Sequence, residues 1–381
     1  MKIKKRILHV TPFFSPNIGG VESHLDDLCV FLKKRGYYQY VITFNPLTTQ
    51  VKAPAIEKSK GMEIYRYWWP GHNLFHKLES YPILEFLYLT PYLFLRSLVF
   101  MINNHQKVDV IHAHGLNAAF ITKFLVLLFK RRTVMSTYAI YNFNPKSIFG
   151  KIVAWTLSSF NEVQPLANPS KKELLRLGLK EKKLRVYYLW INASDFKFIK
   201  KETARKILGL SGKFVALFVG RLIPIKGPKL IMEVAKSLPK INFVFIGDGP
   251  LAGEIAEEVR NYPNVTFVGK VNNEKRNYYY HAADIFVLPS LYEEAFGKVA
   301  IEALFCGKPV IGSKRGAIPD IITPEVGRVI EPTVENFRRE IEELFRNPDK
   351  LSLLSQNCRR WAEKKFSDKN ALVIERGYYE G

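Results

Sequence analysis

Cysteine is scarce and scattered in this chain, and acidic residues are fewer than basic ones. The 381 residues include Cys29, Cys306 and Cys358, an odd set without the paired spacing of a zinc site or a disulfide framework. Low-complexity tracts are missing, and 47% of the residues are hydrophobic against 24% charged, as is typical of a folded globular protein. We therefore expect a reducing compartment and no structural metal.

The N-terminus has no long apolar segment. The stretch MKIKKRILHVTPFF begins with basic residues, but Pro12 interrupts the apolar run too early for a secretory signal peptide. We predict a cytoplasmic protein, either free or peripheral on the cytoplasmic face of a membrane.

The shortage of acidic residues is concentrated in the first half of the chain. Lys and Arg number 57 and Asp and Glu 35, a net charge of +22. Residues 1–200 hold 29 basic and 12 acidic side chains, an excess of +17, whereas residues 201–381 hold 28 and 23, an excess of +5. The asymmetry favours an anionic partner for the first half, and a merely solubilising basic surface is the alternative. Nucleic acid is an unlikely partner, because no helix-turn-helix, RNA-recognition or zinc-finger pattern accompanies the charge.

Apolar segments alternate with helical patterns in both halves of the sequence. KRILHV, YVITF, VDVIHAHG and TVMST are strand candidates in the first half, and the second half contains six more, separated by turns and helices. This alternation predicts an α/β protein with two doubly wound, Rossmann-like domains. We place an N-terminal domain at 1–195, a C-terminal domain at 196–362, and a helix that crosses back to the first domain at 363–381.

The segment from Tyr81 to Ile102 is unusually apolar and aromatic. Its length would span a bilayer, but Glu85, Arg96, Pro82 and Pro91 argue against a transmembrane helix. Two alternatives remain: core helices of the first domain, or an interfacial element that contacts an anionic membrane surface beside the basic clusters.

Two basic residues follow a predicted strand in VGRLIPIKG. Arg221 and Lys226 lie in the loop at the carboxyl end of that strand, where open α/β sheets bind ligands. The planar guanidinium of Arg221 and the compact ammonium of Lys226 are together suited to binding a diphosphate. Basic residues after strands are also common on surfaces, so this motif alone is weak.

Two glutamates flank a Phe-Gly pair in EEAFGKVAIEALFCG. Glu294 is expected in the loop after a strand and Glu302 about one turn inside the following helix, so that the two can face one cleft at different depths. The backbone N–H groups of Phe296, Gly297 and Lys298 would open a helix N-terminus suited to phosphate. Because carboxylates accept hydrogen bonds from hydroxyls, the pattern suits a nucleotide-sugar. An ordinary exposed glutamate is the alternative for Glu302.

In combination, these motifs resemble the retaining glycosyltransferases of the GT-B fold, family 4-like (glycosyl transferases group 1). PSLYEEAFGKVAIEALFCGKPVI resembles their E-x7-E segment, with Glu294 and Glu302 as its glutamates. VGRLIPIKG is similar to their phosphate-binding Arg and Lys, FIGDGP to their glycine-rich turn, and SPNIGGVESHLDDL to their N-terminal glycine loop. VDVIHAHG places His114 at the position of the active-site histidine. The resemblance covers nearly the whole chain in the same order.

The resemblance implies two domains that face each other across a cleft, the N-terminal one (1–195) binding the acceptor and the C-terminal one (196–362) binding the nucleotide-sugar. It also implies a sugar transferred from a UDP- or GDP-linked donor with retention of configuration, without a metal or other cofactor. Arg221 and Lys226 would stabilise the leaving diphosphate. Gly19 and Gly20 would let the backbone approach it, and His114 would hydrogen-bond a hydroxyl of the donor sugar. The acceptor is expected to be anionic or lipid-linked.

Several features depart from the family pattern or leave alternatives open. The family often has a histidine two residues beyond the threonine of TVMST, but here Thr137 is followed by Tyr138 and Ala139. We expect His112 to point to the opposite face of its strand from His114 and to belong to the core. The alternative functions are a nucleotide-sugar epimerase, and a basic nucleic-acid- or membrane-binding protein without catalysis.

Overall fold

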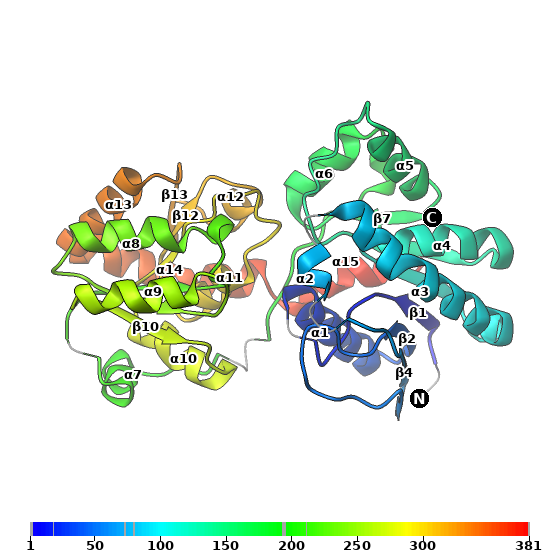
Figure 1. Cartoon of the computed structure of the whole chain (residues 1–381), viewed down its shortest axis with the longest axis horizontal. Coiled ribbons are helices and arrows are strands. Elements are labelled where there is room, and N and C mark those ends of the chain that lie inside the picture. The colour runs from blue at the N-terminus through cyan, green and yellow to red at the C-terminus, as the bar shows by residue number, and fades with distance from the viewer. Residues whose placement is uncertain are drawn as a thin grey trace. The chain divides into compact units, whose positions relative to one another are not determined.

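The computed structural model describes residues 3–17, 19–71, 74–78, 81–192, 196–210 and 212–379. The chain forms two compact units, drawn in Figure 1: unit 1 comprises Met1–Trp190 and Asp368–Gly381, and unit 2 comprises Ile191–Ser367. The predicted boundary at 195/196 touches residues 193–195, which lie outside the described ranges. The C-terminal segment joins unit 1 from Asp368 onward, whereas the sequence suggested residue 363.

Unit 1 is built on a mostly parallel sheet with the order β3-β4-β2-β1-β5-β6-β7 among the described residues. Only the β3–β4 pair in this sheet is antiparallel. The strands are β1 (Arg6–Val10), β2 (Tyr38–Phe44), β3 (Ile56–Ser59), β4 (Met62–Tyr67), β5 (Val110–His114), β6 (Arg132–Ser136) and β7 (Glu162–Gln164). Its helices are α1 (Gly20–Lys34), α2 (Leu74–Leu78), α3 (Pro82–Asn104), α4 (Leu116–Phe129), α5 (Ile148–Leu157), α6 (Ala167–Arg176) and α15 (Ala371–Arg376).

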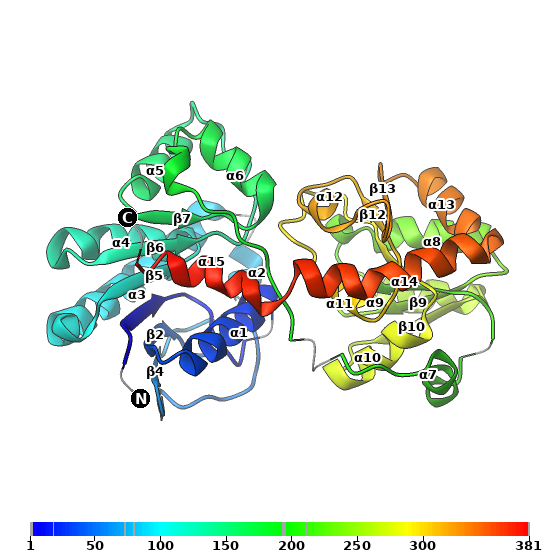
Figure 2. The ribbon, with the colours of Figure 1, turned by 180° about the vertical axis from the view of Figure 1, so that it is seen from behind.

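The two faces of the unit 1 sheet differ in chemistry, because successive residues of a strand point to opposite sides. Leu8, Ile111 and Ala113 point toward α3, α4 and α5 and belong to the large apolar core. His9 and His112 alternate with them and lie on the other face, where α1 and α15 run side by side (Figure 2). One face is therefore an apolar core, and the other carries buried polar groups.

The predicted direction of the His112 side chain was wrong, although the residue is buried as expected. Its ring lies beside that of His114, with centroids 4.0 Å apart, on the same face of β5. Residues two positions apart in a strand share a face, so the two histidines could not point to opposite sides once β5 formed.

The apolar segment at 81–102 forms one long helix, α3, with Pro91 in its interior. Pro82 occupies the first turn, where its missing N–H costs nothing. Leu89, Leu93 and Met101 are buried against the core, so one side of α3 packs on the sheet. By length and composition alone, residues Ile83–Lys107 could also cross a membrane.

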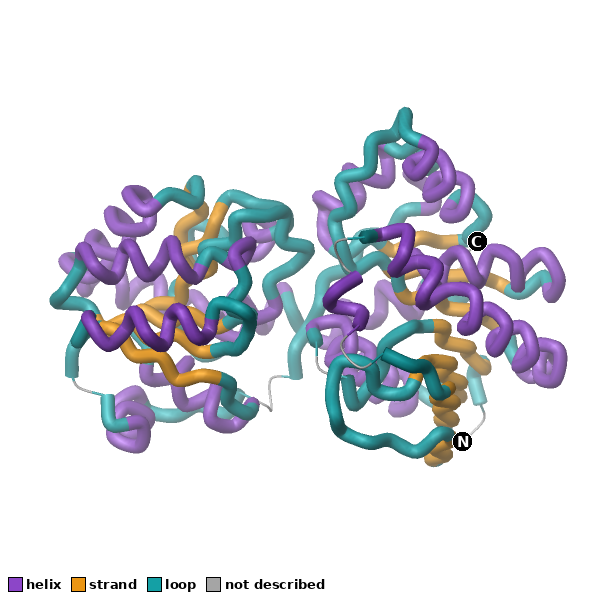
Figure 3. The backbone as a smooth tube through the Cα atoms, viewed as in Figure 1, coloured by secondary structure: helices purple, strands orange, loops and turns teal. Residues whose placement is uncertain are grey.

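Unit 2 is a second α/β domain with a parallel sheet of order β10-β9-β8-β11-β12-β13 among the described residues. Helices α8 and α9 cover one face of the sheet and α11 and α14 the other (Figures 1 to 3). The strands are β8 (Val215–Val219), β9 (Asn242–Ile246), β10 (Val265–Gly269), β11 (Ile285–Leu288), β12 (Val310–Ser313) and β13 (Gly327–Ile330). The helices are α7 (Lys201–Leu208), α8 (Pro228–Ser237), α9 (Ala252–Glu258), α10 (Asn273–Ala282), α11 (Lys298–Phe305), α12 (Ile318–Ile321), α13 (Val334–Arg346) and α14 (Pro348–Lys365). The fold class predicted from the sequence is confirmed for both units.

Candidate active site

The loops after β8 and β11 meet at the carboxyl edge of the unit 2 sheet. The two strands are neighbours, with Ile285 opposite Ala216. The backbone N–H of Leu291 donates to the carbonyl of Ile225 at 2.8 Å. The short 3-10 turn Pro224–Lys226 is therefore fixed beside the loop that carries Glu294.

Lys226 and Glu294 form an ion pair at this edge. The Lys226 ammonium lies 2.9 and 2.7 Å from the two carboxylate oxygens of Glu294. The hydroxyls of Tyr292 and Ser290 also donate to this carboxylate, each at 2.9 Å. Glu294 is 6% exposed, so the carboxylate is held by a cation and two hydroxyls in a largely dry position, where each charge-assisted contact is strong.

Arg221 and Tyr292 belong to the same electrostatic cluster. Burial and the nearby Glu294 carboxylate raise the pKa of Tyr292, and the positive charge of Arg221 opposes that rise. Tyr292 therefore stays protonated and donates. The structure brings Lys226 and Glu294 together, as their positions after β8 and β11 suggested, and the charge of Arg221 acts on the neighbouring Tyr292.

Glycine packing determines the shape of this cluster. Gly227 has φ of +71°, and a Cβ there would lie 2.2 Å from the carbonyl oxygen of Pro289. Gly316 has φ of +52°, and its Cβ would lie 2.1 Å from the carbonyl oxygen of Glu294. Side chains at these positions would push the two loops apart, so the close approach requires glycine.

Glu302 lies in a separate set of contacts on α11. It is 4% exposed, and it accepts from the guanidinium of Arg276 at 3.2 Å and from the hydroxyl of Tyr280 at 2.8 Å. It is therefore not an ordinary exposed helical glutamate. A carboxylate has about four lone-pair positions, so Glu302 retains the capacity to accept further hydrogen bonds.

The N-terminus of α11 lies between the two glutamates. The helix begins at Lys298, and Gly297 precedes it with φ of +81° and provides no side-chain cap. The Phe296 ring is buried and packs edge-on against Phe366, with centroids 5.9 Å apart. Phe296 can therefore offer only its backbone to a ligand.

In unit 1, His114 ends β5 within a buried polar network. Its Nδ1 lies 2.7 Å from the Tyr138 hydroxyl, and its Nε2 lies 2.9 Å from Nδ1 of His9. Burial, reinforced by the neighbouring histidines, lowers the pKa of His114 well below its ordinary value. His114 is therefore neutral, 3% exposed, and engaged at both ring nitrogens.

Three histidines, His9, His112 and His114, lie close enough together to hold a metal ion. However, every ring nitrogen of the three is already hydrogen-bonded. His9 contacts Gln39, and His112 contacts Tyr378 and Ser136, in addition to the His9–His114 and His114–Tyr138 bonds. An ion would have to break these bonds, so the arrangement fits a hydrogen-bonded network better than a metal centre.

The two glycines predicted to approach the donor lie at the start of α1. Gly19 is in extended backbone, and a Cβ there would meet the flexible Glu22 side chain, while a Cβ on Gly20 would meet no atom within 4 Å. Both glycines are exposed. A side chain would therefore fit at Gly20, whereas at Gly19 it would displace the Glu22 carboxylate.

Several site residues were missed by the sequence reasoning. Tyr292 and Ser290 lie inside the E-x7-E segment, and their hydroxyls were a readable signal. His9 lies in β1 and Tyr138 in the loop after β6, and the β5–β1 and β5–β6 pairings bring them to His114.

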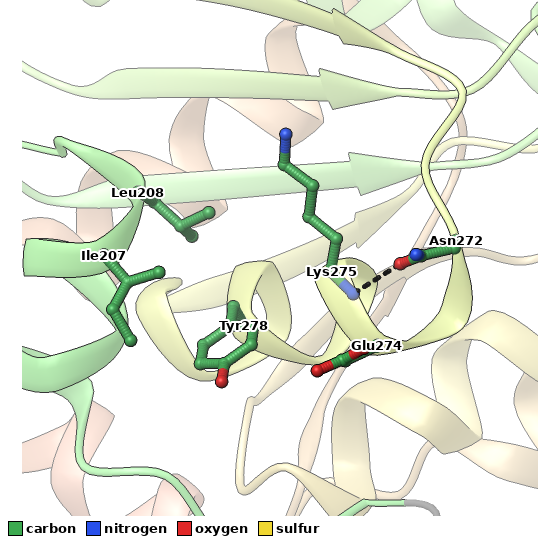
Figure 4. Close-up of a pocket in the computed structure, with 6 residues that line it drawn as sticks. All are labelled: Ile207, Leu208, Asn272, Glu274, Lys275 and Tyr278. Carbon is green, nitrogen blue, oxygen red and sulfur yellow. Dashed lines mark hydrogen bonds between the residues drawn. The ribbon is translucent and has the colours of Figure 1, made fainter.

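A shallow pocket elsewhere on unit 2 contains none of the predicted site residues. It lies between α7 and α10 and is lined by Ile207, Leu208, Asn272, Glu274, Lys275 and Tyr278 (Figure 4). Asn272 caps α10 there by accepting from the Lys275 backbone.

Comparison with known families covers most of the chain. Residues 18–195 match Glycosyltransferase Family 4, and residues 200–361 match Glycosyl transferases group 1. Among curated proteins, a phosphatidylinositol N-acetylglucosaminyltransferase component of Arabidopsis thaliana is 26% identical over 98% of this chain and 82% of that protein. The human protein of the same name is 25% identical over 88% of this chain and 67% of its own length.

Solved structures share the fold. Sucrose-phosphate synthase from Thermosynechococcus elongatus has a TM-score of 0.77 at 21% identity and covers 98% of both chains. The Anabaena protein HepE in complex with UDP-glucose has a TM-score of 0.76 at 19% identity and covers 98% of this chain and 99% of that one. These likenesses show a GT-B type fold with two Rossmann-like domains.

Proposed function

Because the chain belongs to the group 1, family 4 glycosyltransferases, we propose that it moves a sugar from a UDP- or GDP-linked donor to a lipid-linked acceptor, with retention of configuration and without a metal ion. The observation that carries this proposal is the Lys226–Glu294 pair at the carboxyl edge of unit 2, where α/β sheets bind nucleotides.

The donor site acts through charge. As the bond to the sugar breaks, the diphosphate gains negative charge, and we propose that Arg221, Lys226 and the backbone N–H groups that open α11 together stabilise it. These cations supply the positive charge that a metal supplies elsewhere, which supports a metal-independent reaction. On donor binding Lys226 would turn from Glu294 toward phosphate, and the carboxylates of Glu294 and Glu302 would accept from the hydroxyls of the two sugars.

Calorimetry with UDP-N-acetylglucosamine, UDP-glucose and GDP-mannose in EDTA tests the donor. We expect one of them to bind, and the anomeric configuration of the product, read by NMR, to match that of the donor. An inverted product would overturn retention. Binding only after Mg²⁺ is added would overturn metal independence.

The acceptor is proposed to be lipid-linked, and the protein to act as a peripheral protein on the cytoplasmic face of a membrane. The names of the similar proteins specify a phosphatidylinositol acceptor, which supports a lipid. Independent support comes from twelve exposed large apolar side chains of unit 1, here called the α3–α5 face. They are Ile83, Leu84, Leu87, Leu95, Val99 and Ile102 on α3, Leu127 and Leu128 on α4, and Ile148, Phe149, Ile152 and Trp155 on α5.

The α3–α5 face is continuous across its three helices. Leu84, Leu95 and Ile102 recur near helical spacing on the outer side of α3, which would be polar on an ordinary soluble domain. Aromatic rings connect the helices beneath: Phe94 lies 6.1 Å from Phe124, and Phe124 lies 6.3 Å from Trp155, between ring centroids. A continuous apolar surface of this kind indicates an interaction site.

The charge around the α3–α5 face suits an anionic lipid surface. Residues 82–160 contain eight Lys or Arg and two Asp or Glu. The Lys123 ammonium lies 3.7 Å from the centroid of the Trp155 ring, and Lys151 is exposed on α5. Apolar side chains flanked by basic ones bind anionic bilayers through burial and charge together.

Vesicle co-sedimentation tests this surface with the triple variant Leu84→Gln, Leu87→Gln, Leu95→Gln. The variant should bind phosphatidylserine-containing vesicles about tenfold more weakly or worse, because less apolar area is buried. The control variant Ile207→Gln, Val334→Gln, Leu353→Gln changes exposed apolar residues of unit 2 and should bind like the wild type. Equal binding by both variants, or tighter binding to duplex DNA than to vesicles, would overturn the assignment.

A further inference from the structure

A cavity of about 290 Å³ lies at the amino edge of the unit 2 sheet, at the opposite end of β11 from the loop that carries Glu294. It is bounded by the start of α7, the turn after α11 and the first turns of α14, and its polar lining residues are Lys201, Asp284, Lys308, Ser352 and Ser355. Ser352 is exposed and Lys308 is half-buried, so solvent and small ligands can reach the cavity. None of the residues assigned to the donor lines it.

The carboxylate that lines this cavity is already engaged by two cations. Asp284 is buried, and its Oδ1 accepts from the Lys201 ammonium. Its Oδ2 accepts from the guanidinium of Arg205 and from the backbone N–H of Val215, each at 2.7 Å. One negative charge therefore balances only one of these two cations.

Lys308 brings a third cation to the same cavity. Its ammonium donates to the His281 carbonyl at 3.0 Å, and with the described residues it makes no further hydrogen bond and no ion pair. Because an ammonium has three donors, two of them are available to a ligand in the cavity. Burial and the charge of Lys201 lower the pKa of Lys308 to about 8, while Asp284 opposes the shift. Lys308 is therefore still mainly charged at pH 7.

The charges around the cavity leave an excess of +2 at pH 7, since Lys201, Arg205 and Lys308 face one carboxylate, Asp284. A partly buried cation without a matching anion is costly, so the cavity favours an anionic ligand. A dianion balances the excess better than a monoanion does. Phosphate monoesters carry a charge of about −1.5 to −2 at pH 7, and lysine ammoniums are common phosphate ligands.

Two hydroxyls and the size of the cavity also fit a phosphate group. Ser352 and Ser355 lie one turn apart on α14, and both line the cavity. The Ser352 hydroxyl accepts from the side-chain amide of Gln356 at 3.3 Å, which leaves its own proton to donate to a phosphate oxygen. A water molecule needs only about 15 Å³, so a cavity of about 290 Å³ holds a phosphate group together with an ester substituent.

We propose that this cavity is a phosphate-binding site, separate from the donor site, in which Lys201 and Lys308 face a phosphate group from one side and the two α14 serines face it from the other. The proposal goes beyond the transfer reaction and does not depend on it. A phosphate bound there would connect α7, the turn after α11 and α14, and would so stabilise unit 2.

Calorimetry of the full chain at pH 7 tests the site with inorganic phosphate, glycerol 3-phosphate and acetate. At least one of the two phosphate probes should bind with a Kd of about 1 mM or tighter, and the tighter one shows whether the free ion or a monoester is the preferred form. Acetate, a monoanion of similar chemistry, should bind at least about tenfold more weakly. If neither phosphate probe bound, or if acetate bound equally well, the proposal would be overturned.

Three variants place the bound phosphate. Lys308→Met should weaken binding about tenfold or more, because it removes a charged hydrogen-bond donor. Lys229→Met removes a half-exposed lysine of unit 2 that pairs with Glu254 and should leave the Kd within about twofold. Lys226→Met removes a cation of the donor site and should leave this site intact. A loss in Lys226→Met without a loss in Lys308→Met would assign the phosphate to the donor loops instead.

Hydrogen exchange of the wild type with and without the better phosphate probe locates the site without any substitution, and so remains decisive if Lys308→Met fails to fold. Protection of backbone amides should rise in α7 and in the first two turns of α14. It should stay unchanged in the loops after β8 and β11. A rise confined to those two loops would contradict the proposal.

Discussion

The two units hold their candidate site residues by opposite means. In unit 2, Lys226–Glu294 is an ion pair at the carboxyl edge of the sheet, and Arg276–Glu302 is an ion pair between α10 and α11. In unit 1, His114 belongs to a buried network that carries no charge. The electrostatics of a diphosphate donor require fixed charges, whereas a hydroxyl requires oriented dipoles. The difference is consistent with unit 2 binding the donor and unit 1 the acceptor.

Net charge is distributed in the reverse sense. Residues 1–200 carry an excess of +17 but a neutral site, and residues 201–381 carry only +5 but a charged one. The net charge of unit 1 therefore acts at its surface, beside the α3–α5 face, while the charges of unit 2 act locally in pairs. Net charge alone would have predicted a charged site in residues 1–200, whereas the ion-paired site residues lie in residues 201–381.

The largest expected effect comes from neutralising one member of the unit 2 pair. Glu294→Gln keeps the shape of the side chain but removes the charge that holds Lys226, so turnover should fall by about 100-fold or more. Initial rates with the donor identified by calorimetry measure this. Glu233→Gln, which removes the charge of an exposed partner of Lys236, should change the rate by less than about twofold. If Glu294→Gln kept wild-type turnover, the proposed difference between a charged site in unit 2 and a neutral site in unit 1 would be wrong.

A second prediction uses pH to separate the units. The pKa of His9 in the folded unit is about 4 against an ordinary 6.5. Below pH 6.5 the unfolded chain therefore binds a proton that folded unit 1 does not, and stability falls as the pH drops toward 4. This one residue contributes a loss on the order of 3 kcal/mol. His112 and His114 act in the same direction.

Hydrogen exchange read by mass spectrometry at pH 7 and pH 5 follows each unit separately. Between pH 7 and pH 5, the protection of backbone amides from exchange should fall more in β1 and β5 than in β8 and β11. Asp26 opposes the trend, because burial raises its pKa to about 6 and so favours the folded state as the pH falls. The three histidines should outweigh it. A His9→Gln variant should show a smaller loss, and an equal loss would contradict the role given to His9.

The sequence was most informative where apolar runs and glycines coincide. Strands β8, β9 and β11 and helix α11 were predicted because each is a short apolar segment bounded by turn residues. The edge strand β3 and its neighbour β4 were missed, since IEKS and MEIYRY carry charges, and β3 is exposed along its whole length while β4 is only partly buried. Strand β7 has three residues, too few for any periodic pattern.

For the site, the sequence could identify residue types and loop positions but not partners. Glu294 and Lys226 were each predicted on ligand-binding loops, yet their ion pair depends on β8 lying beside β11. The His9–His112 neighbourhood likewise depends on β1 pairing with β5. Strand order is a long-range property that local patterns do not contain.

The smallest predicted effect compares one helix cap from each unit. Ser147 caps α5 by accepting from the Gly150 N–H at 3.0 Å, and Asn272 caps α10 by accepting from the Lys275 N–H at 2.8 Å. Replacing either by alanine should lower the free energy of unfolding by about 1 kcal/mol, as measured by urea denaturation.

Only the Ser147→Ala change should also weaken vesicle binding, and only slightly, because α5 carries Ile148, Phe149, Ile152 and Trp155 of the α3–α5 face. Asn272→Ala is the matched control, since its loss of stability is similar but it lies in unit 2. If both variants lost vesicle binding equally, the effect would follow from stability alone. A loss confined to Ser147→Ala would instead tie membrane contact to the ordered α5 helix of unit 1.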